Sequence, residues 1–483
     1  MARKHAKEKD QLINGLLTLS LATKGRNLQM PGDGRYQPKD LKPWLGYDQW
    51  AGWLVIVEWC WLLTLAKIGV MPKAHAKLLT TERFIRLIQR ITTTKQDAVE
   101  AKTRHDILAL LELMRAVLPK TLHRWLHFGA TSYDIISTAY ALQANCTFTQ
   151  AFWPKLCDLD EIWREKISDN AKVVQAGRTH LQTALPVTVG FWLANLHHRF
   201  LVSSLKALVL CQEIPGKFTG AVGTSSAQRA LFKQKNAEAV LMEILGLPAA
   251  KISTQITPPE GMARFYFELV LLSGSLANLG EDVRILQASE FGEIMSASSS
   301  SSTMAHKKGN PISAENVSGM HTTVQAEFHK IMANLVSDLQ RDLRGSSPMR
   351  SYSAVMVYVF KQVETAIRLL KSLKVDRRCC QKNFGEAKYL VMAELLHLAL
   401  QREGCPDTHS LINQTVVPKA VSHGTNLAAA MDLAFRGEAE FVRYWKSVPE
   451  HIKQLLVHPE QYIGDAVLIA EREAQNGLSR EMC

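Results

Sequence analysis

Apolar residues recur three and four positions apart along most of the chain, whereas strict alternation of apolar and polar residues is scarce. The first spacing places apolar side chains on one face of an α-helix, and the second is typical of a strand. A clear helical series runs through Phe265, Leu269, Leu272, Leu276 and Leu279. The pattern predicts helices over residues 50–68, 73–92, 95–117, 132–172, 185–212, 225–245, 259–292, 311–343 and 347–374. We therefore expect an all-α protein.

Several of these predicted helices are unusually long. The segment from Ser132 to about Lys172 contains no glycine and a single proline, Pro154. At 1.5 Å per residue, a helix over this segment would extend roughly 60 Å. Successive helices of this length are typical of an up-and-down bundle. Because 483 residues are too many for one compact core, we predict three helical domains: residues 1–115, a central long-helix bundle over 116–375, and a smaller C-terminal domain over 376–483.

The most hydrophobic window, Trp50–Met71, is predicted to be a buried helix that ends at Gly69 and Pro72. Glu58 and Lys67 interrupt it, and its longest uncharged run is too short to cross a bilayer. The chain starts with charged residues rather than an apolar stretch, and its eight cysteines form no CxxC pair. Scattered cysteines are typical of a reducing compartment. These features predict a cytoplasmic protein with no membrane partner.

The chain is basic, with 57 Lys and Arg against 45 Asp and Glu, a net charge of +12 and a pI of about 9.2. A positive balance favours anionic partners. The basic residues are spread along the chain, and no zinc-finger or RNA-binding motif is present. We therefore expect a small anionic substrate rather than nucleic acid. The adjacent Cys379 and Cys380 are more simply interpreted as thiols than as a metal site.

Four short segments gather polar residues that packing alone does not require: 103–106, 127–134, 177–182 and 340–350. In the second, Thr131 or Ser132 would cap the long helix that follows, and free N–H groups at a helix start suit a carboxylate or phosphate. The last contains three arginines and two serines, which suit a phosphate. For each segment taken alone, a structural role remains an alternative.

Residues 296–302 read SASSSSS and lie between two long predicted helices. A run of serines resists helix continuation, so we predict a mobile joint here. One interpretation is a plain flexible linker. The downstream residues His306, Lys307, Lys308 and Asn310 favour a second one, a catalytic lid.

Together these motifs resemble the fumarase/aspartase superfamily and, within it, the adenylosuccinate lyase family. Residues 300–311, SSSTMAHKKGNP, are similar to the superfamily's GSSxMPxKxNP loop, and residues 310–316, NPISAEN, are similar to NPIxSEN. The TRHD, HxGxTSxD, GRTHxQ, GAVGT, STQ and QRD…S…R elements follow an N-terminal Arg35-Tyr36 pair. The matches keep the family's order from Arg35 to about Arg350.

The resemblance implies three helical domains whose long central helices assemble a homotetramer. It also implies active sites built from three subunits, no cofactor and no metal. The implied reaction is β-elimination of fumarate from a succinylated nucleotide. In such a reaction a base takes a proton from the succinyl Cβ, and a general acid protonates the leaving nitrogen.

The family motifs also assign roles to individual residues. Ser301 resembles the catalytic base, His180 the general acid, and His105 the histidine that supports the acid. The implied substrate-binding residues are Thr131, Ser132, Lys307 and Asn310 for the carboxylates; Arg35, Tyr36, Arg341, Ser346 and Arg350 for the phosphate; Asp106 and Gln255 near the base or the linker; and Arg104, within the TRHD element.

The loop departs from the family pattern in three places. Ser300 stands where the family has Gly, Ala305 stands where it has Pro, and Gly309 is an additional residue before Asn310. Ser302 therefore remains an alternative base, and Lys308 an alternative to Lys307. Outside the loop, Leu181 replaces the more common glycine.

Other functions remain open at this point. One is another superfamily activity, of the argininosuccinate lyase or carboxymuconate cycloisomerase type, and another is a catalytically silent structural relative. His180 argues against the cycloisomerase, and the Arg341–Arg350 segment favours a nucleotide over an amino-acid conjugate.

Overall fold

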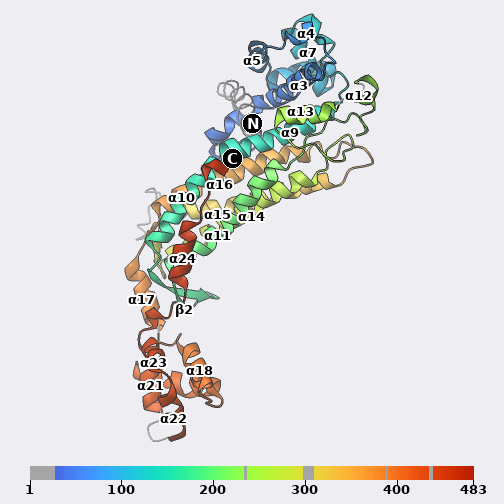
Figure 1. Ribbon diagram of the computed structural model, residues 1–483. Helices are drawn as coiled ribbons and strands as arrows, with labels where there is room; N and C mark the ends of the chain where they lie inside the picture. Colours follow the sequence, from blue (N-terminus) through green and yellow to red (C-terminus); the bar gives the residue numbers. More distant parts are fainter. Residues whose placement is uncertain (1–27, 233–235, 297–308, 388, 435–438, 483) are drawn as a thin grey trace.

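The computed structural model describes residues 28–232, 236–296, 309–387, 389–434 and 439–482, and these are mostly helical. The molecule is elongated, with one group of helices at its N-terminal end, long helices along its middle and a second group at its C-terminal end (Figure 1). Strands form only two small two-stranded sheets within the described residues. The prediction of an all-α fold is confirmed.

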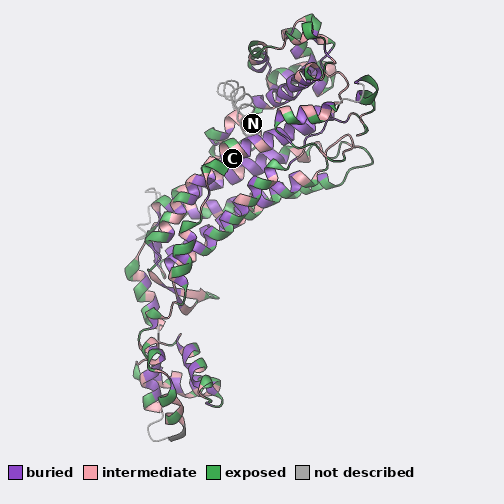
Figure 2. Cartoon of the chain, viewed as in Figure 1, coloured by how far each residue is buried: buried purple, intermediate pink, exposed green. Residues whose placement is uncertain are grey.

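The N-terminal group surrounds one strongly apolar helix. Its helices are α2 (Lys42–Leu45), α3 (Trp50–Lys67), α4 (Lys73–Ala76), α5 (Thr81–Arg90), α6 (Thr93–Thr103), α7 (Asp106–Val117) and α8 (Lys120–His123). The stretch Tyr47–Lys67 is long and apolar enough to cross a membrane, but 83% of its apolar window is buried inside the protein. The burial view shows the same (Figure 2), so α3 is a core helix, as predicted.

Two predicted helices of this group are each broken in two. The range 73–92 contains α4 and α5, and the range 95–117 contains α6 and α7. The second break has a local cause: Arg104 adopts a left-handed conformation at φ 55°, and His105 begins the next helix as its N-cap. An apolar period continues through such a break, so periodicity alone does not reveal it.

The central bundle consists of α9 (Ser132–Thr147), α10 (Trp153–Asp169), α11 (Val189–Gln212), α14 (Glu260–Gln287), α15 (Ile312–Met332) and α16 (Ser351–Ser372). A π-helical turn, Phe148–Phe152, joins α9 to α10 without ending the helix. Pro154 lies in the first turn of α10, directly after the π-helical turn. Its missing backbone N–H costs little stability at this position. The predicted long helix is therefore present, and residues 132–169 extend about 55 Å.

A β-hairpin replaces the start of the predicted helix 185–212. Strands β1 (Val174–Thr179) and β2 (Gln182–Thr188) pair antiparallel, and α11 begins only at Val189. The Oγ1 of Thr188 accepts the Phe191 N–H at 3.1 Å and caps α11. Pro186 together with the β-branched Val187 and Thr188 favours the extended chain. The predicted helix start was therefore wrong.

Three other predicted helices were too long. The helix predicted over 311–343 ends at Met332, and the one predicted over 259–292 ends at Gln287. The range 225–245 contains two shorter helices, α12 (Ser226–Leu231) and α13 (Ala237–Leu245).

The C-terminal group has its own apolar core. Its helices are α17 (Arg377–Ala387), α18 (Ala393–Arg402), α19 (Thr408–Leu411), α20 (Val417–His423), α21 (Leu427–Ala434), α22 (Ala439–Ser447) and α23 (Glu450–Val457). A separate cluster of buried residues from Met392 to Leu456 forms this core. The last long helix, α24 (Ala466–Gln475), packs instead against α10 and α11. A second small sheet pairs β3 (Ile294–Met295) with β4 (Lys374–Val375).

Candidate active site

Several polar contacts gather at the N-terminal end of α9. Thr131 is the N-cap, and its backbone N–H donates to Asp134 Oδ2 at 2.9 Å in a reciprocal capping box. The Ser132 hydroxyl lies 3.4 Å from His105 Nε2. Free N–H groups and the positive end of the helix dipole at this point favour an anion.

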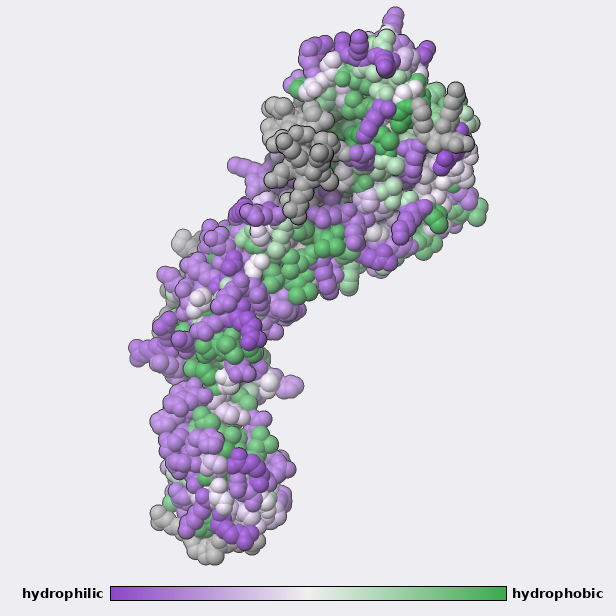
Figure 3. Space-filling model, in the orientation of Figure 1, coloured by the Kyte–Doolittle hydropathy of each residue, from purple (hydrophilic) through white to green (hydrophobic). Residues whose placement is uncertain are grey.

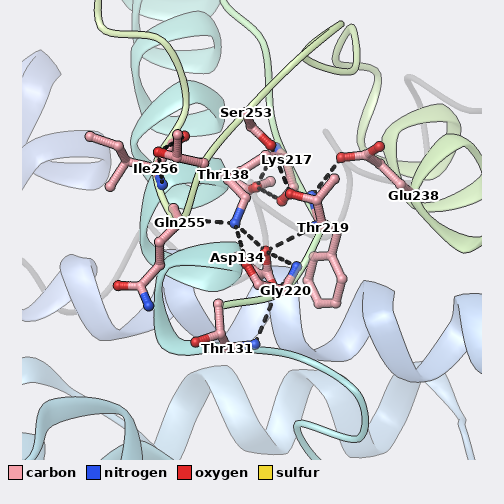
Figure 4. Close-up of polar contacts among 12 residues, drawn as sticks. Thr131, Asp134, Thr138, Lys217, Thr219, Gly220, Glu238, Ser253, Gln255 and Ile256 are labelled. Atoms are coloured by element: carbon pink, nitrogen blue, oxygen red, sulfur yellow. Dashed lines mark hydrogen bonds and ion pairs between the residues drawn. The ribbon is translucent and has the colours of Figure 1, made fainter. Parts of the chain in front are cut away.

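A buried ion pair stands behind this cap (Figure 4). Lys217 Nζ lies 2.6 Å from Asp134 Oδ1, and both side chains are 0% exposed. Asp134 also accepts the backbone N–H groups of Thr219 and Gly220 at 3.1 and 3.2 Å. Burial lowers the pKa of Lys217 from its ordinary value, while Asp134 acts in the opposite direction.

Residues 104–106 lie next to the start of α9, because His105 contacts Ser132. His105 caps α7, and its Nδ1 lies 3.3 Å from Asp106 Oδ1. The His105 side chain is 43% exposed, so it can reach a ligand. Arg104 is exposed, at the left-handed end of α6.

The guanidinium of Arg341 is held over the same helix end. It lies 3.5 Å from the centroid of the Tyr133 ring and donates from Nη1 to Gln255 Oε1 at 2.7 Å. A stacked and hydrogen-bonded arginine is pre-oriented for a planar anion. The structure therefore brings Ser132, Gln255 and Arg341 together around Tyr133.

Arg350 and Ser346 complete this end of the bundle. Arg350 Nη1 donates to the Tyr140 hydroxyl at 2.9 Å and to the Ser346 carbonyl at 3.3 Å. Ser346 lines a small cavity shared with Tyr133, Asn334 and Tyr352. The predicted phosphate residues of the 340–350 segment thus lie beside the predicted carboxylate residues of α9.

His180 lies at the opposite end of the bundle. It forms the two-residue turn of the β1–β2 hairpin with Leu181, and both have positive φ, 52° and 60°. Both residues are exposed. This is the geometry of a type I′ turn, which glycine and asparagine adopt more readily. His180 is therefore presented at the tip of the hairpin, near β2 in Figure 1.

The base of the hairpin is held by a buried acid. Glu293 is 0% exposed and forms an ion pair with Arg178, and it accepts from Gln175 Nε2 at 2.7 Å and from Asn383 Nδ2 at 2.8 Å. The arginine of the GRTHxQ element therefore has a structural partner, whereas the histidine two residues later points outward.

Ser301 and Lys307, with the alternatives Ser302 and Lys308, lie outside the described residues. The residues that flank this segment are attached to one buried amide. Gln287 Oε1 accepts the Ser296 N–H at 3.0 Å, and Gln287 Nε2 donates to the Gly309 carbonyl at 3.2 Å. Gly309 has φ 70°, a conformation that favours glycine. Asn310 follows it at the start of α15, at the hairpin end of the bundle.

Tyr36 lies partway along the bundle. Its ring centroid is 5.5 Å from that of Tyr358 in α16, and its hydroxyl accepts from Asn316 Nδ2 at 3.4 Å. Tyr358 is eight positions after Arg350, which corresponds to about 12 Å along a helix. Arg35 beside it is exposed. The Arg35-Tyr36 pair is therefore not part of the Arg341 cluster within one chain.

The described site residues thus fall into three places on one chain: the α9 end, the hairpin end and the Tyr36 region. Among the described residues, no group of three or more His, Cys, Asp or Glu side chains could hold a metal ion.

The sequence patterns did not reveal the residues that connect the start of α9 to the loops packed against it. Lys217, Asp134 and Tyr133 were not predicted as site residues. A lysine next to the GAVGT element within an apolar stretch was a clue, because a buried ammonium needs a partner. Which acid would pair with it could not be inferred from spacing, since the two residues are 83 positions apart.

A family model described as "Lyase" matches residues 72–326, more than half of the chain. The adenylosuccinate lyase of Archaeoglobus fulgidus is 30% identical over 456 residues, covering 92% of this chain and 97% of that relative. The adenylosuccinate lyase of Methanocaldococcus jannaschii is also 30% identical, covering 84% of this chain and 87% of that relative.

Solved structures share the fold at lower identity. The fumarate lyase of Mesorhizobium sp. BNC1 superposes with a TM-score of 0.74 at 21% identity, covering 92% of this chain and all of that one. The 3-carboxy-cis,cis-muconate lactonizing enzyme of Pseudomonas putida gives a TM-score of 0.72 at 23% identity, covering 88% and 94%. The chain is a lyase and belongs to the lyase family of the fumarase/aspartase superfamily.

Proposed function

We propose that this chain is an adenylosuccinate lyase. It would eliminate fumarate from adenylosuccinate to give AMP, and from the succinylated imidazole-carboxamide ribotide in purine biosynthesis. Relatives from A. fulgidus, M. jannaschii and Bacillus subtilis carry the name adenylosuccinate lyase, the first two at 30% and the last at 29% identity.

One observation carries the choice of substrate class. The α9 N-terminus, with Thr131 and Ser132, lies in the same region as Arg341 and Arg350. The first group suits a carboxylate, and the arginines suit a phosphate. A succinylated nucleotide carries both anions, whereas argininosuccinate and carboxymuconate carry no phosphate.

The reaction assigns a task to each end of the bundle. A base removes the proton from the succinyl Cβ, and the electron pair left behind expels the nitrogen as the C–N bond breaks. His180 would protonate that nitrogen, supported by His105, and Ser301 would be the base. Positioned donors stabilise the charge that develops on the carboxylate next to the carbanion. Thr131, Ser132, Lys307 and Asn310 would supply those donors.

A homotetramer would bring the separated groups together. His105 and His180 lie at opposite ends of residues 132–169, on the order of 50 Å apart, so one chain does not bring them to one site. Exposed apolar side chains occur along two bundle helices, Val202 and Val209 on α11 and Phe267 and Leu271 on α14. The space-filling view shows apolar surface over this part of the bundle (Figure 3). Such surface supports packing against further copies, with active sites shared between subunits.

Purified protein should release fumarate from adenylosuccinate in the absence of added metal or cofactor. The change in ultraviolet absorbance of the purine measures this reaction. Turnover of argininosuccinate or a carboxymuconate instead would replace this proposal with another superfamily activity. No turnover of any of these substrates would favour a silent relative. In a cell, the enzyme is expected in the cytoplasm, with neither nucleic acid nor membrane as partner.

A further inference from the structure

Lys217 is the buried cation that connects the loops of the α9 end. Its three ammonium N–H groups face three acceptors: Asp134 Oδ1 at 2.6 Å, the Gln255 carbonyl at 2.9 Å and the Gly220 carbonyl at 3.2 Å (Figure 4). An ammonium has three donors and no acceptor, so this set satisfies it fully.

The three acceptors belong to three different segments. Asp134 lies in the first turn of α9, Gly220 begins the GAVGT element, and Gln255 ends the STQ element. A fourth contact fixes the backbone of Lys217 itself, because the Thr138 hydroxyl bonds both its N–H, at 3.1 Å, and its carbonyl, at 2.8 Å. Lys217 therefore sets the spacing between α9 and the Gln255 loop.

Asp134 and Gln255, the two residues that Lys217 holds apart, each contact the proposed substrate-binding residues. Asp134 holds the Thr131 N–H, and thus the cap that presents Ser132. The Gln255 side chain holds Arg341, which stacks on Tyr133 of the same α9 turn. Every link in this ring is a hydrogen bond, an ion pair or a ring contact. Lys217 itself is 0% exposed and cannot touch a ligand.

We propose that Lys217 is a positioning residue: its ammonium fixes the α9 cap and the Gln255 backbone so that Ser132 and Arg341 face the same anionic substrate. The inference rests on the proposed function. Arg341 would hold the phosphate, which takes no part in the reaction, so its displacement should raise KM and weaken AMP binding. Ser132 would also stabilise the charge that develops during the elimination, so its displacement should lower kcat as well.

The test compares Lys217→Met with the full-length wild-type enzyme. We expect a rise of at least about tenfold in KM for adenylosuccinate and in the inhibition constant of AMP, together with a lower kcat. Wild-type values of both constants in a folded Lys217→Met enzyme would overturn the inference.

A second variant separates positioning from general stability, because Lys217→Met leaves the Asp134 carboxylate buried without a cation. Lys217→Met combined with Asp134→Asn removes both charges and keeps an oxygen for the Thr131 N–H. The melting temperature should recover toward wild type while KM stays raised. Recovery of KM together with the melting temperature would reduce Lys217 to a structural role and overturn the inference.

Two further variants complete the design. Thr138→Val displaces the Lys217 backbone without exposing a charge, and should raise KM by about threefold. If neither Lys217 variant folds, an unchanged KM in Thr138→Val overturns the inference. His197→Asn is the matched control: it disturbs a buried charged cluster elsewhere in the bundle, and should lower the melting temperature with KM unchanged. A wild-type enzyme that binds AMP without releasing fumarate would refute the proposed function, and Lys217 would then be judged on AMP affinity.

Discussion

The two ends of the central bundle are built in different ways. At the α9 end, Thr131, Ser132, Gln255 and Arg341 are held by bonds within one chain, and a buried ion pair lies beneath them. At the other end, His180 stands exposed on a two-residue turn. The polar groups of the first end are fixed by contacts within the chain, whereas the second end presents an imidazole to the surface. If His180 acts with the residues of the α9 end, as proposed above, those residues must come from another subunit.

The largest effect is expected at the exposed end. His180→Ala should lower kcat by about 10²- to 10⁴-fold, the usual contribution of a positioned general acid. Stability should change by less than about 0.5 kcal/mol, because the side chain is exposed. Steady-state kinetics and a melting curve test both statements. A kcat within tenfold of wild type would remove His180 from the proposed chemistry.

The next effect concerns the structure behind the hairpin. His197 is 0% exposed, with Nε2 2.9 Å from Asp160 Oδ1 and Nδ1 2.8 Å from Glu473 Oε1, so it connects α11 to α10 and α24. His197→Asn removes the central partner of two carboxylates, and should cost about 3–5 kcal/mol of unfolding free energy. Denaturant titration measures this cost, and a loss below about 1 kcal/mol would show that the cluster contributes little.

The same cluster predicts a pH trend. Burial lowers the pKa of His197, but hydrogen bonds to Asp160 and Glu473 outweigh it and leave the pKa above its ordinary value of 6.5. Arg164 beside Asp160 and His198 beside Glu473 are the other ionisable groups at the cluster. A raised folded-state pKa gives stability that is complete below pH 6.5 and is lost as pH rises through the folded value. The wild-type melting temperature should therefore fall above pH 6.5, and the fall should be smaller in His197→Asn.

At the α9 end the expected effect is on binding. Arg341→Met should raise KM about 10- to 100-fold, because it would remove the proposed charge-assisted contact to the substrate phosphate. Arg344→Met is the matched control, since Arg344 is exposed and forms ion pairs with Asp338 and Asp342. Equal effects of the two variants would mean that general surface charge, rather than the held geometry of Arg341, governs binding.

The smallest effect tests the strained turn. Leu181 has φ 60°, which a side chain adopts at a cost of roughly 1 kcal/mol. Leu181→Gly should therefore stabilise the protein by up to about 1 kcal/mol and leave kcat near wild type. A destabilised variant would show that the Leu181 side chain has a packing role in the assembled enzyme.

Much of the fold could be predicted because a long amphipathic helix shows a regular spacing of apolar residues in the sequence. The apolar pattern predicts the continuous helix from Ser132 into α10 through Pro154, but it also predicts a helix from residue 185, where the structure has the end of β2. The apolar period that predicts a helix over 185–212 includes residues 185–188, although Pro186 and the β-branched Val187 and Thr188 favour an extended chain, and pairing with β1 holds them in a strand. The breaks at Arg104 and Met332 depend on local backbone conformation, which periodicity does not encode.

The candidate site also contains some residues that the sequence predicts and others that only the structure reveals. Motif order assigned Ser132, His105 and Arg341, and the structure brings these residues into one region. Their buried support, Lys217 with Asp134, depends on a long-range contact that no spacing rule contains. His180 and Asn310 lie at the other end of the bundle, and the catalytic and binding roles of all these residues remain predictions. The division into domains 1–115, 116–375 and 376–483 also remains a prediction.

The most direct test is complementation between two inactive variants, His105→Ala and His180→Ala, co-expressed with different affinity tags and purified as mixed oligomers. If each active site takes His105 and His180 from different subunits, about a quarter of the sites in a random mixture carry both histidines. We expect mixed oligomers to regain about a quarter of the wild-type adenylosuccinate turnover, while each variant alone stays inactive. Mixed oligomers no more active than either variant alone would contradict this expectation.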